Sequence, residues 1–111
     1  MQIRYLGGDK QDGDVFVVET IAEGGLVLES HKHEHAHTSI LVSGKARVTI
    51  DGVARELEGY QIITVPANTM HKVESITPIV WLCLWAGNLA PREQAEQSLK
   101  VAEAFNAQAA D

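Results

Sequence analysis

The sequence of 111 residues has little that would mark an extracellular, membrane or nucleic-acid-binding protein. Its single cysteine, Cys83, excludes an internal disulfide and favours a reducing, cytoplasmic setting. Nine Lys and Arg residues are scattered singly against fifteen Asp and Glu residues, which argues against nucleic acid or an anionic membrane as partner. No apolar run approaches the roughly 20 residues of a membrane span, and the N-terminus lacks a signal-peptide core. We therefore expect a small-molecule ligand or substrate as the partner.

Short apolar runs rich in Val, Ile, Leu and Thr alternate with turn signals over most of the chain. Asp51-Gly52 is the clearest turn, because a two-residue hairpin of the mirror-image type needs positive φ at both positions. This spacing is typical of an all-β sandwich or barrel. The expected strands are Val15–Thr20, Leu26–His31, Thr38–Val42, Ala46–Ile50, Val53–Leu57, Gln61–Val65, His71–Ile76 and Ile79–Ala86.

The two ends of the chain differ from this β region. Residues 1–14 are expected to form an N-terminal arm, residues 15–87 the barrel, and residues 88–111 a helix and tail. Pro91 suits a first helical turn, and a thin apolar stripe recurs at helical spacing through Ala95, Leu99, Ala102 and Phe105. We expect a short C-terminal helix followed by a frayed tail, with a disordered tail as the alternative.

Four of the five histidines stand in the stretch HKHEHAH, residues 31–37. In a strand, His31 and His33 share a face about 6.7 Å apart, close enough to converge on one ion. His37 would lie about 20 Å from His31 along a straight strand, so a bend over residues 34–36 is needed to bring it back. The alternatives are a solvated polar strand or an opportunistic metal-binding tract.

Two spaced motifs surround these histidines. The first reads Gly25, five residues, His31, one residue, His33, three residues, His37, six residues, Gly44. The second reads Gly59, six residues, Pro66, one residue, Asn68, two residues, His71, three residues, Ser75. This pair resembles the motifs of the cupin superfamily, and of its small single-domain (monocupin) type with four histidines. The family usually has Glu at the position of His37 and Gly at that of Asn68, and Asn tolerates a left-handed conformation best among the other residues.

The resemblance implies a small cupin β-barrel, a double-stranded β-helix of jelly-roll type, with an ion held inside one end. His31, His33, His37 and His71 would be the metal ligands, and His35 would be a rim histidine or, alternatively, an acid or base at the mouth. Imidazole suits Zn, Cu, Fe and Ni, and the resemblance favours Fe or Mn as the one divalent transition metal ion. Four ligands would leave two positions open on a six-coordinate ion.

The walls of the expected pocket are mainly apolar. Strand alternation places Ser39 and Leu41 on the face of His37, and Val73 on the face of His71. In the last strand either face could line the pocket, with Trp81, Cys83 and Trp85 on one side and Leu82 and Leu84 on the other.

These features favour a metal-dependent, oxygenase-type enzyme, possessing a dioxygenase-like site for O₂ and a small, mainly apolar molecule. The alternatives are a non-redox isomerase or lyase acting on a sugar-like or keto-acid substrate, and a small-ligand binder without turnover. We also expect a homodimer, because the last strand is apolar on both faces and the helical stripe needs a surface to cover.

Overall fold

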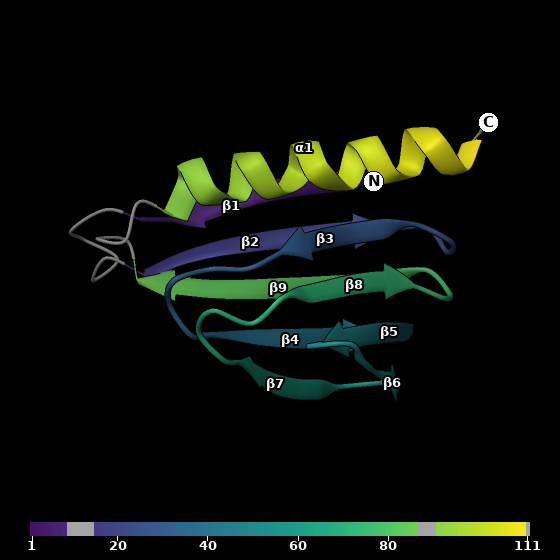
Figure 1. Cartoon of the computed structure of the whole chain (residues 1–111), viewed down its shortest axis with the longest axis horizontal. Helices are drawn as coiled ribbons and strands as arrows, with labels where there is room; N and C mark the ends of the chain where they lie inside the picture. Colours follow the sequence, from purple (N-terminus) through teal and green to yellow (C-terminus); the bar gives the residue numbers. More distant parts are fainter. Residues whose placement is uncertain (9–14, 87–90, 111) are drawn as a thin grey trace.

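The computed structural model describes residues 1–8, 15–86 and 91–110, and it is a two-sheet β-sandwich with one helix alongside (Figure 1). One antiparallel sheet has the strand order β1-β2-β9-β4-β7, and the other has the order β3-β8-β5-β6. The all-β class with a C-terminal helix is thereby confirmed. The elements are β1 (Gln2–Gly7), β2 (Val15–Ala22), β3 (Val27–His31), β4 (His37–Ser43), β5 (Lys45–Ile50), β6 (Val53–Glu58), β7 (Gln61–Val65), β8 (His71–Ser75), β9 (Ile79–Ala86) and α1 (Pro91–Ala110).

The expected strands agree with the observed ones, and β1 is the addition. It lies within the segment expected to be an arm, and it pairs only with β2 at the edge of its sheet. Its side chains are mostly exposed, so its sequence lacks the apolar alternation that marks a half-buried strand. The rest of that arm, residues 9–14, and the expected boundary at residues 87–88 lie outside the described residues. Helix α1 takes in almost all of the segment for which we expected a short helix and a tail.

Two turns have the backbone that the sequence predicts. Asp51 and Gly52 have φ angles of 48° and 81°, as a mirror-image hairpin between β5 and β6 requires. Asn68 has a φ of 58°, so it occupies the left-handed conformation that the resemblance assigned to this position. The second turn leads directly into β8 and therefore helps to place His71.

The core lies between the two sheets, and β9 contributes its largest side chains. Trp81, Cys83 and Trp85 are buried there, whereas Leu82 and Leu84 on the opposite face are half-buried. The structure thus answers which face of β9 points inward. This choice matters for the site, because β9 lies between β2 and β4 in the middle of its sheet.

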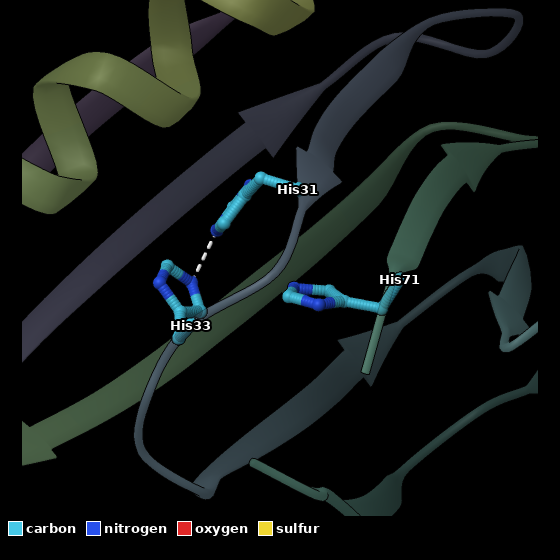
Figure 2. Close-up of side chains that lie close together, drawn as sticks. All are labelled: His31, His33 and His71. Carbon is cyan, nitrogen blue, oxygen red and sulfur yellow. Dashed lines mark hydrogen bonds between the residues drawn. The ribbon is translucent and has the colours of Figure 1, made fainter. Parts of the chain in front are cut away.

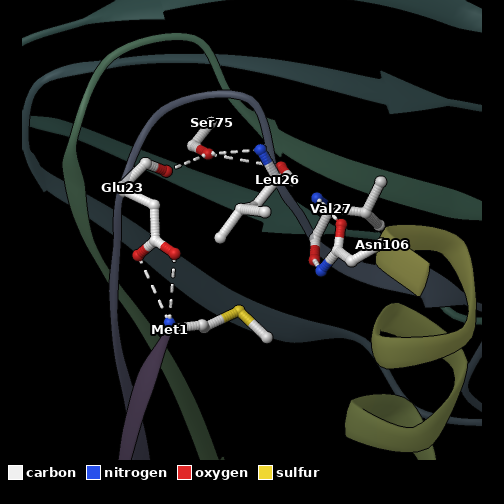
Figure 3. A network of polar contacts seen from close by, with 6 residues as sticks. All are labelled: Met1, Glu23, Leu26, Val27, Ser75 and Asn106. Carbon is white, nitrogen blue, oxygen red and sulfur yellow. Dashed lines mark hydrogen bonds and ion pairs between the residues drawn. The ribbon is translucent and has the colours of Figure 1, made fainter. Parts of the chain in front are cut away.

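Helix α1 covers the free edge of β3 (Figure 3). The Asn106 amide accepts a hydrogen bond from the Val27 N–H at 2.8 Å and donates one to the Val27 carbonyl at 3.0 Å, as a neighbouring strand would. Phe105 is 39% exposed and carries Lys72 Nζ at 4.9 Å from its ring centroid. The apolar stripe of the helix is thus used within the chain, which removes one of our two reasons for expecting a dimer.

A second set of polar contacts ties the β2–β3 connection to β8. The Ser75 hydroxyl donates to the Glu23 carbonyl at 2.6 Å and accepts from the Leu26 N–H at 3.0 Å (Figure 3). The N-terminal ammonium of Met1 contacts the Glu23 carboxylate at 3.2 Å. These contacts hold the start of β3 and so stabilise the strand that carries His31. In the part of the chain that the structure describes, no helix is both long and apolar enough to cross a membrane.

Candidate metal centre

Three connected elements bring four histidines to one end of the sandwich. His31 ends β3 and faces His71, the first residue of β8, as its direct partner across the ladder. His33 lies in the loop over residues 32–36, and His37 begins β4. That loop is the bend that the spacing of His33 and His37 requires. Figure 2 shows the rings of His31, His33 and His71 pointing toward one another.

The four rings form one cluster. Ring centroids are 3.9 Å apart for His31 and His33, and 4.7 Å apart for His31 and His71. His37 lies 5.1 Å from His33 and 5.3 Å from His71. The Nε2 atoms of His31 and His33 lie against each other (Figure 2). One nitrogen each from His31, His33 and His71 falls within a 4.8 Å set, close to the spacing of about 3–4 Å between imidazoles that share one ion.

The burial and bonding of these rings fit a metal ion. His33, His37 and His71 are 7%, 6% and 1% exposed. Neither ring nitrogen of His37 or of His71 has a hydrogen-bond partner among the described residues. Buried polar atoms are nearly always bonded, so four such nitrogens in one cluster call for a partner that the protein chain does not supply. A divalent cation is the partner that this donor set suits.

The surroundings of the rings orient them and keep them neutral. Ser98 Oγ of α1 lies 2.9 Å from His31 Nδ1, which leaves Nε2 on the side of the cluster. Burial lowers the pKa of His31 to about 4 and that of His33 to about 3, and it lowers the pKa of His37 as well. The rings are therefore unprotonated at pH 7, as metal ligands must be.

Trp85 is a site residue that our sequence analysis placed on the correct face without assigning it to the pocket. Its ring stacks on His37 with centroids 5.1 Å apart and an interplanar angle of 3°. It also meets the ring of His33 edge-on at 4.4 Å. The indole thus packs against two of the four imidazoles and restricts how they can turn.

Glu29 is the residue that sequence reasoning missed. Its side chain is buried, with one carboxylate oxygen 3.5 Å from His71 Nε2 and the other 3.5 Å from Cys83 Sγ. Burial raises the pKa of Glu29, but the adjacent His71 and further histidines outweigh it and lower that pKa to about 2. The signal was present, because Glu29 stands two residues before His31 and therefore shares its face in a strand.

The other expected pocket residues are all buried. Ser39, Leu41, Val73 and Trp81 are at most 1% exposed, and Cys83 is 3% exposed. Burial raises the pKa of the Cys83 thiol well above its usual range, and Ser39 Oγ lies 3.5 Å from its sulfur. Cys83 therefore remains a thiol at neutral pH. His35 is half-buried in the loop, and among the described residues it does not join the metal-ligand clusters.

Two hollows adjoin the cluster from opposite sides. An open cleft is bordered by the histidine loop and by α1, and its lining residues are His31, Lys32, His33, Glu34, Gln97, Ser98 and Val101. A more enclosed, mainly apolar hollow lies between the sheets beneath α1, and Glu29, Trp81, Cys83 and Trp85 are among its lining residues. A small molecule from solution would thus meet His31 and His33 first, while Glu29 lies on the inner side.

Comparisons with known proteins agree with this geometry. The profile of the family described as Cupin domain matches residues 17–85. KdgF from Halomonas sp. is 25% identical, with 75% of this chain and 74% of that chain covered at a TM-score of 0.65. A cupin superfamily protein from Desulfitobacterium hafniense is 15% identical over 77% of this chain and 75% of its own, with a TM-score of 0.67.

A third solved structure is much longer than this chain. The oxalate decarboxylase of Bacillus subtilis, which has Mn(II) centres, is 20% identical over 66% of this chain and 21% of its own, at a TM-score of 0.59. At that identity the likeness speaks for the fold alone. A search of curated proteins found no match.

Proposed function

This chain belongs to the cupin domain family, and we propose that it is a metal-dependent enzyme with one divalent transition metal ion per chain. We assign the ligands as His31, His33, His37 and His71. The observation that carries the proposal is the cluster of buried, unpartnered ring nitrogens on His37 and His71 beside His31 and His33. Fe or Mn is the favoured ion, with Zn, Ni or Cu as alternatives. The one cysteine, buried as a thiol, accords with a cytoplasmic setting.

We propose an oxygenase-type reaction on a small, mainly apolar molecule. An ion held here would supply a redox-active, Lewis-acidic centre. The residues of this chain exclude water around it, because Trp85 stacks on His37 and the neighbouring Leu41 and Val73 are fully buried. Exclusion of water limits side reactions of reactive oxygen species, and that need suits an apolar wall. The cleft beside His31 and His33 gives a route for the substrate.

A second candidate is a non-redox isomerase or lyase reaction on a sugar-like or keto-acid substrate. The observation that favours it is the buried carboxylate of Glu29, with Ser39 and Cys83 nearby. Such substrates require polar groups inside the site, and our sequence analysis found only Ser39 and His35 for that purpose. Glu29 therefore makes this candidate stronger than the sequence alone did.

The test begins with protein purified without an affinity tag. Elemental analysis should find about one transition metal ion per chain. The Fe and Mn forms should then be screened for oxygen uptake with small apolar compounds, and nitric oxide should bind the ferrous protein. Full activity of a zinc form without oxygen would select the second candidate. Ligand binding with no turnover in any metal form would leave a binding protein.

We also propose a homodimer, on the remaining argument from exposed apolar side chains. Val53, Tyr60 and Ile62 are 67%, 65% and 57% exposed on and between the edge strands β6 and β7. A patch of this kind is often an interface. Sedimentation at micromolar concentration should give twice the 12.1 kDa chain mass, and a monomer would refute this proposal.

A further inference from the structure

Glu29 lies in the interior of the barrel at the level below the histidines. It pairs with Val73 across the β3–β8 ladder, just as His31 pairs with His71. Val73 is fully buried two residues after His71, so this pair of positions faces the same interior space. The β3–β8 register shifts between Val27 and Glu29, and Leu28 and Glu29 are both buried beside that irregularity. The structure thus builds the carboxylate into the site rather than leaving it at the surface.

The contacts of this carboxylate leave its charge without a fixed cation. In the described part of the chain it touches the ring of His71 and the thiol of Cys83, and no lysine or arginine. A buried carboxylate is strongly unfavourable unless it is paired or bound to a metal. The Cys83 thiol is a weak donor, and the 3.5 Å separation from His71 Nε2 exceeds an ordinary hydrogen bond.

The spacing of the donor atoms suits one shared ion. Two atoms bound to the same ion at about 2.0–2.2 Å lie at most about 4.4 Å apart, and Glu29 Oε1 lies 3.5 Å from His71 Nε2. Donor atoms of Glu29, His37 and Cys83 also fall within 4.8 Å of one another. Glu29 therefore links two groups of donors, one formed by His31, His33 and His71 and the other containing His37.

We propose that Glu29 is a fifth protein ligand of the metal ion, binding through its carboxylate beside the four histidines. This inference rests on the proposed metal site and adds to it the one negative charge that four imidazoles lack. A carboxylate oxygen favours hard ions such as Mn²⁺ over softer ones, so Glu29 would bias the choice of metal. It would also leave one position on a six-coordinate ion instead of two. An oxygen-dependent reaction would then hold its organic substrate in the cleft rather than on the ion.

The test compares metal binding by wild type, Glu29→Gln and Glu74→Gln. Glu74 follows Val73 on β8 and makes only a 3.9 Å contact with Lys72 at the surface, so its variant removes the same charge from a neighbouring, outward position. Metal-free protein is titrated with MnCl₂ while the electron paramagnetic resonance of free Mn(II) is followed, and with ZnCl₂ and CuCl₂ by chelator competition. Glu29→Gln should weaken Mn(II) binding at least tenfold, and Zn(II) or Cu(II) binding by a smaller factor, while Glu74→Gln stays within twofold of wild type.

Other outcomes overturn the inference in distinguishable ways. Mn(II) binding by Glu29→Gln within twofold of wild type means that the carboxylate is not a ligand. Equal weakening for all three metals means that Glu29 only positions His71, and equal weakening in Glu74→Gln means a distant charge effect. Wild type that binds no metal removes the proposed function and this inference together. If Glu29→Gln fails to fold, Glu29→Asp keeps the charge and shortens the side chain, and unchanged Mn(II) affinity there also overturns the proposal.

Discussion

Strands β3 and β6 are the two edges of the same sheet, and the chain treats them in opposite ways. In β3, Leu28, Glu29 and Ser30 are all buried, and α1 covers its free edge. In β6 only Leu57 is buried, and the other side chains are exposed. An uncovered edge offers unpaired backbone groups to other chains, so covering one is a common protective device. Here the covered edge is the one that carries His31 and Glu29, which indicates that α1 serves the site as well as the fold.

The largest expected effect comes from removing a ligand at the covered edge. His71→Ala should weaken metal binding at least a hundredfold, because it removes a buried donor at the centre of the cluster. His35→Ala is the matched control, since it removes an imidazole from the same loop region without touching the clustered nitrogens, and it should change affinity less than threefold. Isothermal titration with the metal alone measures both. The reverse result, with His35 essential and His71 dispensable, would contradict the assigned ligands.

The fold was largely predictable because its signals are local. The strands from Val15 to Ala86 and the Asp51-Gly52 hairpin follow from alternation and turn residues. The clustering of His37 with His33 followed from the motif resemblance and the need for a bend. Glu29 was missed because its role depends on which residues surround it across β8 and β9, and one strand's sequence does not contain that information. The same is true of β1, whose position is set by pairing with β2 rather than by its own pattern.

Acid should destabilise the metal-free protein through the histidines of the covered edge. The pKa values of His31 and His33 are about 4 and 3 in the folded chain, below the ordinary value of 6.5. Between these values the unfolded chain binds more protons, so stability is full above about pH 6.5 and falls as the pH drops toward 3. Glu29, with its pKa at about 2, adds a further loss below pH 4.5. Urea unfolding at pH 8, 6, 5 and 4 measures this; a flat profile from 8 to 4 would contradict it.

A smaller effect is expected from the contact between α1 and the site. Ser98→Ala removes the hydroxyl that lies 2.9 Å from His31 Nδ1 and so frees the ring to turn. Loss of such an outer partner of a metal ligand weakens binding by about 10- to 100-fold, and we expect the lower end because one ligand among several is affected. Ser98→Thr keeps the hydroxyl and should recover most of the affinity. Equal affinity for wild type and Ser98→Ala would mean that α1 covers the edge without orienting the histidine.

The smallest effect tests the two edges directly. Asn106→Ala removes the two hydrogen bonds that its amide makes with Val27, and we expect a loss of about 1 kcal/mol in unfolding free energy, since water can replace part of them. Arg55→Ala on β6 is the counterpart, because Arg55 is an exposed side chain on the uncovered edge, and it should stay within about 0.5 kcal/mol. Denaturant unfolding of both variants gives the free energies. Hydrogen exchange should show the difference at the residue level, with Val27 losing protection in Asn106→Ala and the β6 amides unchanged in both variants. Equal losses in the two variants would mean that α1 adds nothing to the edge it covers, and its role at the metal site would then have to rest on Ser98 alone.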